Sequence, residues 1–250
     1  MRNLRFVHEI HVVAEYDNET LFRLLRMSMT ISADSAEVQL PLCPVCESGT
    51  LQFFQEVRDT VYHRCSQCEA TVMDSRHWLT EAQERDVYAL HDNHPDDPGY
   101  RRFLSKVTAP LLRRLEAGSY GLDFGCGPGP ALAAMLEDSG MHVSLYDPFF
   151  HPDQATLARR YDFVTCTEVV EHLHRPADVF RQLDRLLKPG GWLAVMTCFQ
   201  TDDSRFANWH YRRDPTHVVF YRETTLAWLA SAYGWDLEVP EKDVALFRKL

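Results

Sequence analysis

A glycine-rich run, GCGPG at residues 125–129, follows a short apolar stretch that ends at Phe124. Glycines at such a turn let the backbone adopt positive φ and approach a ligand closely. The spacing is G-x-G-x-G, whereas the dinucleotide fingerprint needs G-x-G-x-x-G. Asp123 stands two residues before the first glycine, where its carboxylate would repel a pyrophosphate. The run therefore favours a ligand that carries a positive amino group and no phosphate.

A second acidic residue, Asp147, ends the next apolar stretch along the chain. A carboxylate at this point can accept two hydrogen bonds from a ribose diol, each worth about 1.5–3 kcal/mol. Ligands of open α/β sheets bind at the carboxyl ends of the strands. We therefore expect Asp123, the glycine run and Asp147 to converge on one crevice.

Two Cys-x-x-Cys pairs are separated by 18 residues, a spacing typical of a four-thiolate zinc site. The residues between the pairs can form a hairpin that brings the four sulfurs together in tetrahedral geometry. Four thiolates leave no open position for a substrate, so such a zinc ion would be structural. The expected metal ligands are Cys43, Cys46, Cys65 and Cys68.

The elements that must position these residues begin at about residue 120, where short apolar runs alternate with amphipathic segments. The predicted strands cover 120–124, 142–146, 162–167 and 192–197. The predicted helices cover 130–139, 176–187 and 223–233. This alternation predicts an α/β fold, doubly wound, with a mostly parallel sheet. Residues 235–239 and 244–250 flank a short polar turn and predict a C-terminal antiparallel hairpin at the edge of the sheet.

Residues 122–129, Asp147 and the C-terminal hairpin together resemble the class I S-adenosylmethionine-dependent methyltransferases, over about residues 100–250. The resemblance implies that the glycine run faces the amino acid moiety of the cofactor and that Asp147 binds its ribose. It also implies that the strand at 162–167 leads into the active site. The expected cofactor contacts are Asp123, Gly125, Cys126, Gly127, Gly129, Asp147, Thr167 and Glu168.

The connection at 148–161 departs from the family's pattern. The family usually fits a helix and a third strand here, and that strand commonly ends in a residue that reads the adenine amino group. One crossover connection alone takes a dozen or more residues, so the 14 residues here leave too little chain for a helix and a further strand. We therefore expect the third strand to be vestigial, and the sequence names no residue for the adenine.

The expected catalytic residues are His217, His172 and Glu171. Glu171 would share a face with Glu168 if a helical turn follows the strand at 162–167, and His172 could accept a proton near neutral pH. His217, followed by VVF, resembles a histidine common near the substrate pocket of small-molecule members of the family. Two alternatives stay open: Glu171 and His172 only orient the turn beside the cofactor, and His217 only caps a turn.

The segment 208–221 concentrates aromatic residues, two histidines and paired arginines where the family places a substrate-covering loop. Its aromatic residues could equally be the packing of a lid. Residues 76–118 look helical in two pieces, broken by a turn-rich run at 92–99, and in this family such a segment often folds over the cofactor. The expected substrate contacts are His210, Tyr211, Asp214, Tyr88 and Tyr100.

The predicted organisation has three parts. Residues 1–37 form an N-terminal extension, 38–75 a small zinc-ribbon-like module, and 76–250 the methyltransferase domain. The third part divides into a helical lead-in at 76–118 and a core at 119–250.

Composition and charge limit the functional classes. Of 250 residues, 45% are hydrophobic and 25% charged, which is ordinary for a globular protein. A formal net charge of −10 repels phosphate backbones and disfavours bulk binding to nucleic acid. The sequence has no apolar stretch long enough to span a membrane, and acidic residues interrupt the N-terminal region where a signal peptide is apolar. With seven cysteines interpreted as reduced thiols or metal ligands, we expect a cytoplasmic protein.

The sequence favours an enzyme that transfers a methyl group from S-adenosylmethionine to a small molecule or metabolite. A second interpretation is an RNA methyltransferase, since some of these enzymes resemble this layout of a zinc module before the methyltransferase domain. The net charge and the lack of a basic patch in residues 43–68 argue against it. A third interpretation is a non-catalytic, cofactor-binding or scaffolding relative. The intact residues 123–129 and Asp147 argue against loss of cofactor binding.

Overall fold

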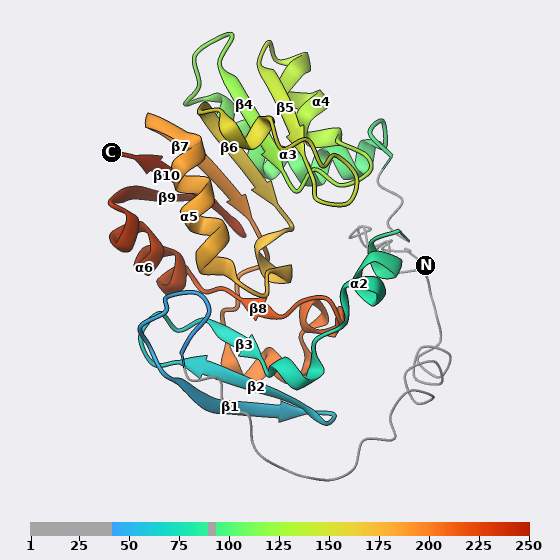
Figure 1. The fold of residues 1–250 in the computed structure, drawn as a ribbon, viewed down its shortest axis with the longest axis vertical. Helices are drawn as coiled ribbons and strands as arrows, with labels where there is room; N and C mark the ends of the chain where they lie inside the picture. The colour runs from blue at the N-terminus through green and yellow to red at the C-terminus, as the bar shows by residue number, and fades with distance from the viewer. Residues whose placement is uncertain (1–41, 90–93) are drawn as a thin grey trace, which may run out of the picture.

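The computed structural model describes residues 42–89 and 94–250. The predicted extension at 1–37 lies outside these ranges. The described residues build two sheets, one of six strands and one of four (Figure 1). Apart from the α-helices, they contain short 3-10 helices, which are η1 Ser75–His77, η2 Thr156–Ala158, η3 Val170–His172, η4 Asp203–Asn208 and η5 His210–Arg213.

The six-stranded sheet has the order β5-β4-β6-β7-β10-β9. The pairs β4–β5, β4–β6 and β6–β7 are parallel, whereas β10 is antiparallel to both β7 and β9. The mostly parallel sheet and the C-terminal antiparallel hairpin are thereby confirmed. Its strands are β4 Tyr120–Phe124, β5 His142–Tyr146, β6 Tyr161–Thr167, β7 Leu187–Met196, β9 Trp235–Glu241 and β10 Val244–Lys249.

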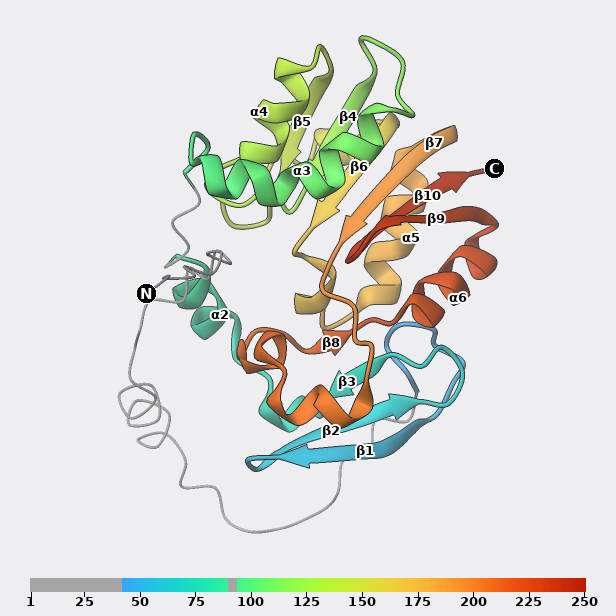
Figure 2. The same cartoon turned by 180° about the vertical axis from the view of Figure 1, so that it is seen from behind.

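Helices cover both faces of this sheet, as the doubly wound prediction requires. Figures 1 and 2 show α3 and α5 on opposite faces. Phe163, Ala194 and Leu246 belong to the core on the α3 side, whereas their neighbours Val164 and Val195 belong to the core on the α5 side. This alternation follows from the two-residue period of a strand. The helices are α2 Glu81–Tyr88, α3 Pro98–Leu112, α4 Ala131–Asp138, α5 Pro176–Leu186 and α6 Glu223–Tyr233.

The connection between β5 and β6 carries no third strand. It contains an isolated bridge between Asp147 and His151 and then the 3-10 helix η2, so β5 is an edge of the sheet. The expectation of a vestigial third strand is therefore confirmed. None of the helices in residues 42–89 and 94–250 is long and apolar enough to cross a membrane.

The two Cys-x-x-Cys pairs flank the predicted hairpin. Arg58 and Asp59 form its two-residue turn, with φ of 50° and 67°. The hairpin belongs to the smaller sheet, whose order is β1-β2-β3-β8. Its strands are β1 Leu51–Val57, β2 Thr60–Cys65, β3 Thr71–Met73 and β8 Val219–Phe220.

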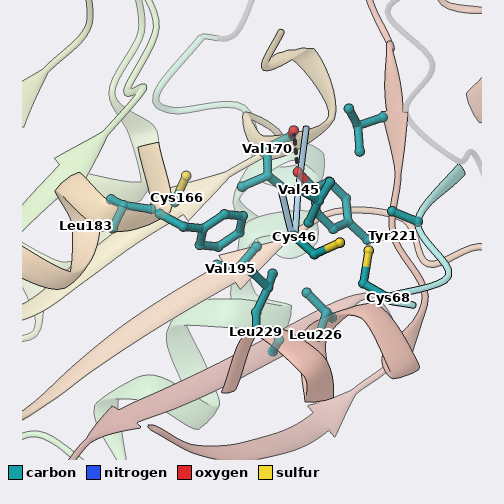
Figure 3. Packing of buried hydrophobic residues seen from close by; sticks show 14 of the residues in the cluster. Val45, Cys46, Cys68, Cys166, Val170, Leu183, Val195, Tyr221, Leu226 and Leu229 are labelled. Atoms are coloured by element: carbon teal, nitrogen blue, oxygen red, sulfur yellow. Dashed lines mark hydrogen bonds between the residues drawn. The ribbon is translucent and has the colours of Figure 1, made fainter. Parts of the chain in front are cut away.

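The cysteine-bearing segment shares this sheet and a hydrophobic core with the rest of the chain. The strand β8, which comes from the segment after β7, pairs with β3. Figure 3 shows Val45, Cys46 and Cys68 beside Tyr221, close to side chains of α6. The Ala177 amide at the start of α5 donates a hydrogen bond to the Pro44 carbonyl, 3.1 Å away. The predicted boundary at residues 75 and 76 is thus bridged by backbone pairing.

Candidate active site

The glycine run forms a tight turn between β4 and α4. Gly125 and Gly127 have φ of +77° and +64°, a region that L side chains rarely adopt. The Gly125 amide donates to the Tyr146 carbonyl at the end of β5, 2.8 Å away. A Cβ on Gly125 would lie 2.4 Å from Val169 Cγ2, whereas a Cβ on Gly127 would meet no atom within 4 Å. The turn is therefore packed tightly at its first glycine and open at its second.

The Asp147 carboxylate joins this turn to the tip of β5. Its Oδ2 accepts a hydrogen bond from the Gly127 amide at 3.1 Å. Its Oδ1 accepts from the amides of Phe149 at 2.8 Å and Phe150 at 3.1 Å. Asp147 is buried, and these three backbone donors hold its carboxylate in place. The expected convergence of Asp147 with the glycine turn is present.

Asp123 lies buried in β4, two residues before the first glycine of the turn. Its Oδ1 accepts a hydrogen bond from Thr165 Oγ1 at 2.7 Å, and no lysine or arginine of the described residues forms an ion pair with it. Burial raises the pKa of Asp123 to about 6, because no solvent stabilises its charged form. The pKa of Tyr100 is raised to about 12, mainly by burial and to a smaller extent by the negative charges of Asp123 and Glu168. A cation placed here would gain a buried carboxylate partner.

Past the end of β6, Glu168 and Glu171 share one tyrosine. Tyr211 donates toward Glu168 Oε2 at 3.2 Å and makes a shorter hydrogen bond to Glu171 Oε1. Glu168 has a φ of 52°, and the 3-10 helix η3 places Glu171 one turn further on. Burial and then Glu171 raise the pKa of Glu168 well above its usual range, and burial raises the pKa of Glu171. The fully buried Glu171 and the half-buried Glu168 therefore share one hydroxyl group.

Two histidines stand next to Glu171. His172 and His217 have ring centroids 4.6 Å apart. Nδ1 of His172 lies 3.2 Å from the Thr216 carbonyl, and Nδ1 of His217 lies 2.7 Å from the Tyr211 carbonyl. Burial, and then His217, lower the pKa of His172 to about 4. The His172 ring is therefore neutral at pH 7 and a weak proton acceptor.

Aromatic rings from distant segments line this part of the site. Tyr88 at the end of α2 contacts His172 edge-on at 5.4 Å and Phe149 at 5.9 Å, both between ring centroids. The ring centroids of Tyr211 and His217 are 4.2 Å apart. Figure 2 shows the arrowheads of β6 and β7 pointing toward the chain around β8, from which His217 comes. The carboxyl edge of the sheet thus meets α2 and the segment before β8.

The four cysteines of the predicted metal site also come together. All four sulfurs lie within 4.8 Å of one another and are buried. The sulfurs of Cys43 and Cys68 are 3.7 Å apart, and those of Cys46 and Cys65 are 3.5 Å apart. Backbone amides point at two of these sulfurs, with the Gly49 amide 3.2 Å from Cys46 Sγ.

Comparison with known proteins decides the family. Residues 98–238, more than half of the chain, match the family described as Methyltransferase domain. The chain belongs to this family. The matched residues contain the glycine turn, Asp147, both glutamates and both histidines described above.

Curated relatives match the methyltransferase domain over a shorter stretch. The ubiquinone biosynthesis O-methyltransferase of Serratia proteamaculans (strain 568) is 34% identical over 91 residues, which are 36% of this chain and 38% of that protein. The protein of the same name from Escherichia coli O127:H6 is 34% identical over 85 residues, 34% of this chain and 35% of that protein. The chain thus matches less than two fifths of the length of these relatives.

Solved structures show a more distant likeness. The 1,6-didemethyltoxoflavin-N1-methyltransferase of Burkholderia thailandensis has 17% sequence identity and a TM-score of 0.47, over 79% of this chain and 99% of that one. CalO1, a methyltransferase in calicheamicin biosynthesis, has 14% identity and a TM-score of 0.43, over 68% of this chain and 59% of that one.

The methyltransferase domain brings most of the expected residues together. Thr167 ends β6 beside the crevice, Cys126 lies within the turn, and Gly129 accepts the hydrogen bond of the first α4 amide. Asp214 Oδ2 is 3.9 Å from His217 Nε2. His210 differs, since it is exposed at the start of η5. The roles of all these residues remain predictions.

The sequence reasoning missed two contributors. Thr165 holds the Asp123 carboxylate, and Phe149 both donates to Asp147 and contacts Tyr88. The run DPFF after a predicted strand could have revealed the second, because an aspartate at a turn often accepts from amides two and three residues later. No local pattern marks Thr165, since its contact crosses between neighbouring strands.

Proposed function

We propose that this chain is an S-adenosylmethionine-dependent methyltransferase that acts on a small molecule. The observation that carries the proposal is the Asp147 carboxylate, which is fixed on the Gly127 amide and so joins the strand tip to the glycine turn. The open space at Gly127 and the buried carboxylate of Asp123, which pairs with no lysine or arginine in residues 42–89 and 94–250, fit a ligand with an amino group and a ribose. Bound S-adenosylmethionine supplies an activated methyl group.

The chain's own residues would bind the cofactor, orient the acceptor and exclude water. Asp123 offers a negative charge to the amino group of the cofactor, and Asp147 offers an acceptor to its ribose. Tyr88 and Tyr211 contact the histidines and Phe149 packs on Tyr88, so these rings border the place where an acceptor would be held in line with the methyl group. Alignment of two reactants in a dry site accounts for much of the acceleration in such displacements.

The acceptor class follows from charge and from the walls of the site. A net charge of −10 disfavours an RNA substrate. Aromatic side chains beside the histidines suit a flat organic acceptor. The name O-methyltransferase borne by the two curated relatives supports oxygen as the methylated atom.

Binding of the cofactor tests this proposal most directly. Native mass spectrometry of the purified protein, followed by calorimetry with S-adenosylmethionine and S-adenosylhomocysteine, should show one bound cofactor per chain. Affinities in the micromolar range are expected, equivalent to about 8 kcal/mol. Failure of both compounds to bind at about 1 mM, where the free energy is roughly 4 kcal/mol, would refute the proposal.

We further propose that the four cysteines bind one structural zinc ion. Zn–S bonds of about 2.3 Å in tetrahedral geometry place sulfurs about 3.8 Å apart, close to the 3.7 and 3.5 Å found here. Zinc would hold the two Cys-x-x-Cys turns against α5 and α6. Arg181 of α5 pairs with Glu47, and Thr224 of α6 donates to Glu69, each beside one pair of cysteines.

Metal analysis tests the zinc proposal. We expect one zinc per chain in the wild type and none in Cys43→Ser, with a lower unfolding temperature because the cysteine turns pack on the main core. Cys198→Ser is the matched control, since Cys198 lies outside the cluster and should leave the zinc content unchanged. A wild-type protein that folds without zinc, or a Cys43→Ser variant that keeps it, contradicts the assignment.

A further inference from the structure

A second group of side chains that could hold a metal ion lies close after Val169, which packs on the glycine turn. Glu171, His172 and His217 each offer one donor atom, and these atoms all lie within 4.8 Å of one another. Donors bound to one ion at about 2.1 Å lie up to about 4.2 Å apart, so side-chain movements of about 1 Å close the set. Glu171 Oε1 and His172 Nε2 are already 3.9 Å apart.

The backbone fixes both rings in the form that binds metals. A carbonyl oxygen only accepts hydrogen bonds, so the contacts of Nδ1 with the Thr216 and Tyr211 carbonyls place the ring proton on Nδ1 of each histidine. Nε2 of each ring therefore keeps its lone pair. Metal-binding histidines usually have this arrangement, in which the second ring nitrogen donates to a carbonyl or a carboxylate.

The carboxylates supply an independent reason for a cation. Glu171 is fully buried, and its Oε2 makes no hydrogen bond within the described part of the chain. Across residues 42–89 and 94–250, neither Glu171 nor Glu168 forms an ion pair with a lysine or an arginine. A fully buried carboxylate that keeps its charge, such as that of Glu171, is costly unless a positive charge compensates it.

We propose that Glu171, His172 and His217 bind a divalent transition-metal ion. Two imidazoles and one carboxylate favour manganese, iron, cobalt, nickel or zinc over magnesium and calcium, which prefer oxygen ligands only. Three protein ligands leave positions open for a further ligand, unlike the four-cysteine site. The two sites would therefore differ in role.

The proposed metal ligands follow the segment that packs on the glycine turn. Val169, between Glu168 and Glu171, packs on the first glycine of the cofactor turn. An acceptor hydroxyl bound at the ion would lose its proton to solvent water more readily. Its oxygen then forms the bond to the methyl carbon, while the carbon–sulfur bond breaks with its electron pair kept by sulfur. This role rests on the proposed function, whereas the metal site itself does not.

Cobalt(II) is a suitable probe because its visible spectrum reports the ligands. We expect the zinc-loaded wild-type protein to bind one additional Co²⁺ without the absorption band of a thiolate–cobalt bond. His217→Gln should weaken this binding by more than about 100-fold, the upper range for loss of an outer partner of a ligand. His174→Gln is the matched control, because His174 also lies near a carboxylate, 2.9 Å from Glu84, but outside the set.

Folding of each variant is followed by its zinc content and its unfolding temperature. If His217→Gln does not fold, Glu171→Gln, which keeps the shape of the buried side chain, gives the same test. No additional Co²⁺ bound by the wild type, or equal binding by the wild type and the ligand variants, overturns the inference. If methyl transfer occurs without this metal binding, the metal site is wrong and the proposed function stands. If the metal binds but the cofactor does not, the proposed function is wrong and the metal site stands.

Discussion

Asp147→Asn is the sharpest perturbation of the cofactor site. Asp147 Oδ1 accepts from Phe149 and Phe150, while Oδ2 accepts from Gly127. An asparagine can keep its carbonyl oxygen on the two phenylalanine amides, but its NH₂ group then faces Gly127 and cannot accept a hydrogen bond. The variant thus preserves the turn after β5 and removes the acceptor on the cofactor side.

The expected loss of cofactor affinity in Asp147→Asn follows from the number of acceptor positions on the carboxylate. A carboxylate has about four lone-pair sites, of which the three amides use three, so one site on Oδ2 remains for a ribose hydroxyl. One charge-assisted hydrogen bond is worth about 1.5–3 kcal/mol. Since 1.4 kcal/mol corresponds to a factor of ten, the dissociation constant for the cofactor should rise by about 10- to 150-fold.

Calorimetry with S-adenosylhomocysteine measures this change, and thermal unfolding without ligand checks that the fold is kept. Asp153→Asn is the matched control, because Asp153 also accepts from a backbone amide of the same connection but is exposed. We expect its affinity to stay within about twofold of the wild type, in line with a surface change. An Asp147→Asn variant that binds as tightly as this control would refute the assignment of Asp147 to the ribose.

Two further predictions concern the same crevice. The pKa of Asp123 in the folded chain, about 6, lies above its ordinary value of 3.8, so ionisation opposes folding increasingly as the pH rises from about 4 to 6. Asp123→Asn should therefore be up to about 3 kcal/mol more stable than the wild type at pH 7, equally stable near pH 4, and weaker in cofactor affinity, as urea unfolding at both pH values and calorimetry can show. Gly125→Ala should lose about 2–5 kcal/mol of stability from a left-handed φ and the clash with Val169. Gly127→Ala, with a similar φ and no clash, should lose only about 1–2 kcal/mol; equal losses in the two variants would show that the Val169 contact has no cost.

The local elements of the fold could be predicted from the sequence because their causes are local. The strands at 120–124 and 142–146 and the helix at 223–233 have the predicted bounds. Apolar runs bounded by glycine or proline set these limits within a few residues of chain. The absent third strand was predictable for the same reason, since it depends only on the length of one connection.

Contacts between distant segments were not predictable in this way. The pairing of β3 with β8 joins residues about 150 positions apart, through a strand of only two residues. The structure places the Tyr211 hydroxyl between Glu168 and Glu171, a contact for which the sequence has no signal. A short segment carries no signal for its partner, because tertiary packing decides which segments meet.

The sequence by itself determined the sheet, the glycine turn, the acid at the tip of β5 and the four-cysteine spacing. Each depends on residue type and spacing within a short stretch of chain. Only the tertiary structure decided that Glu171 and His172 from η3 meet His217 from the segment before β8. It also decided which backbone carbonyl lies against Nδ1 of each ring, because the positions of Thr216 and Tyr211 depend on the packed chain.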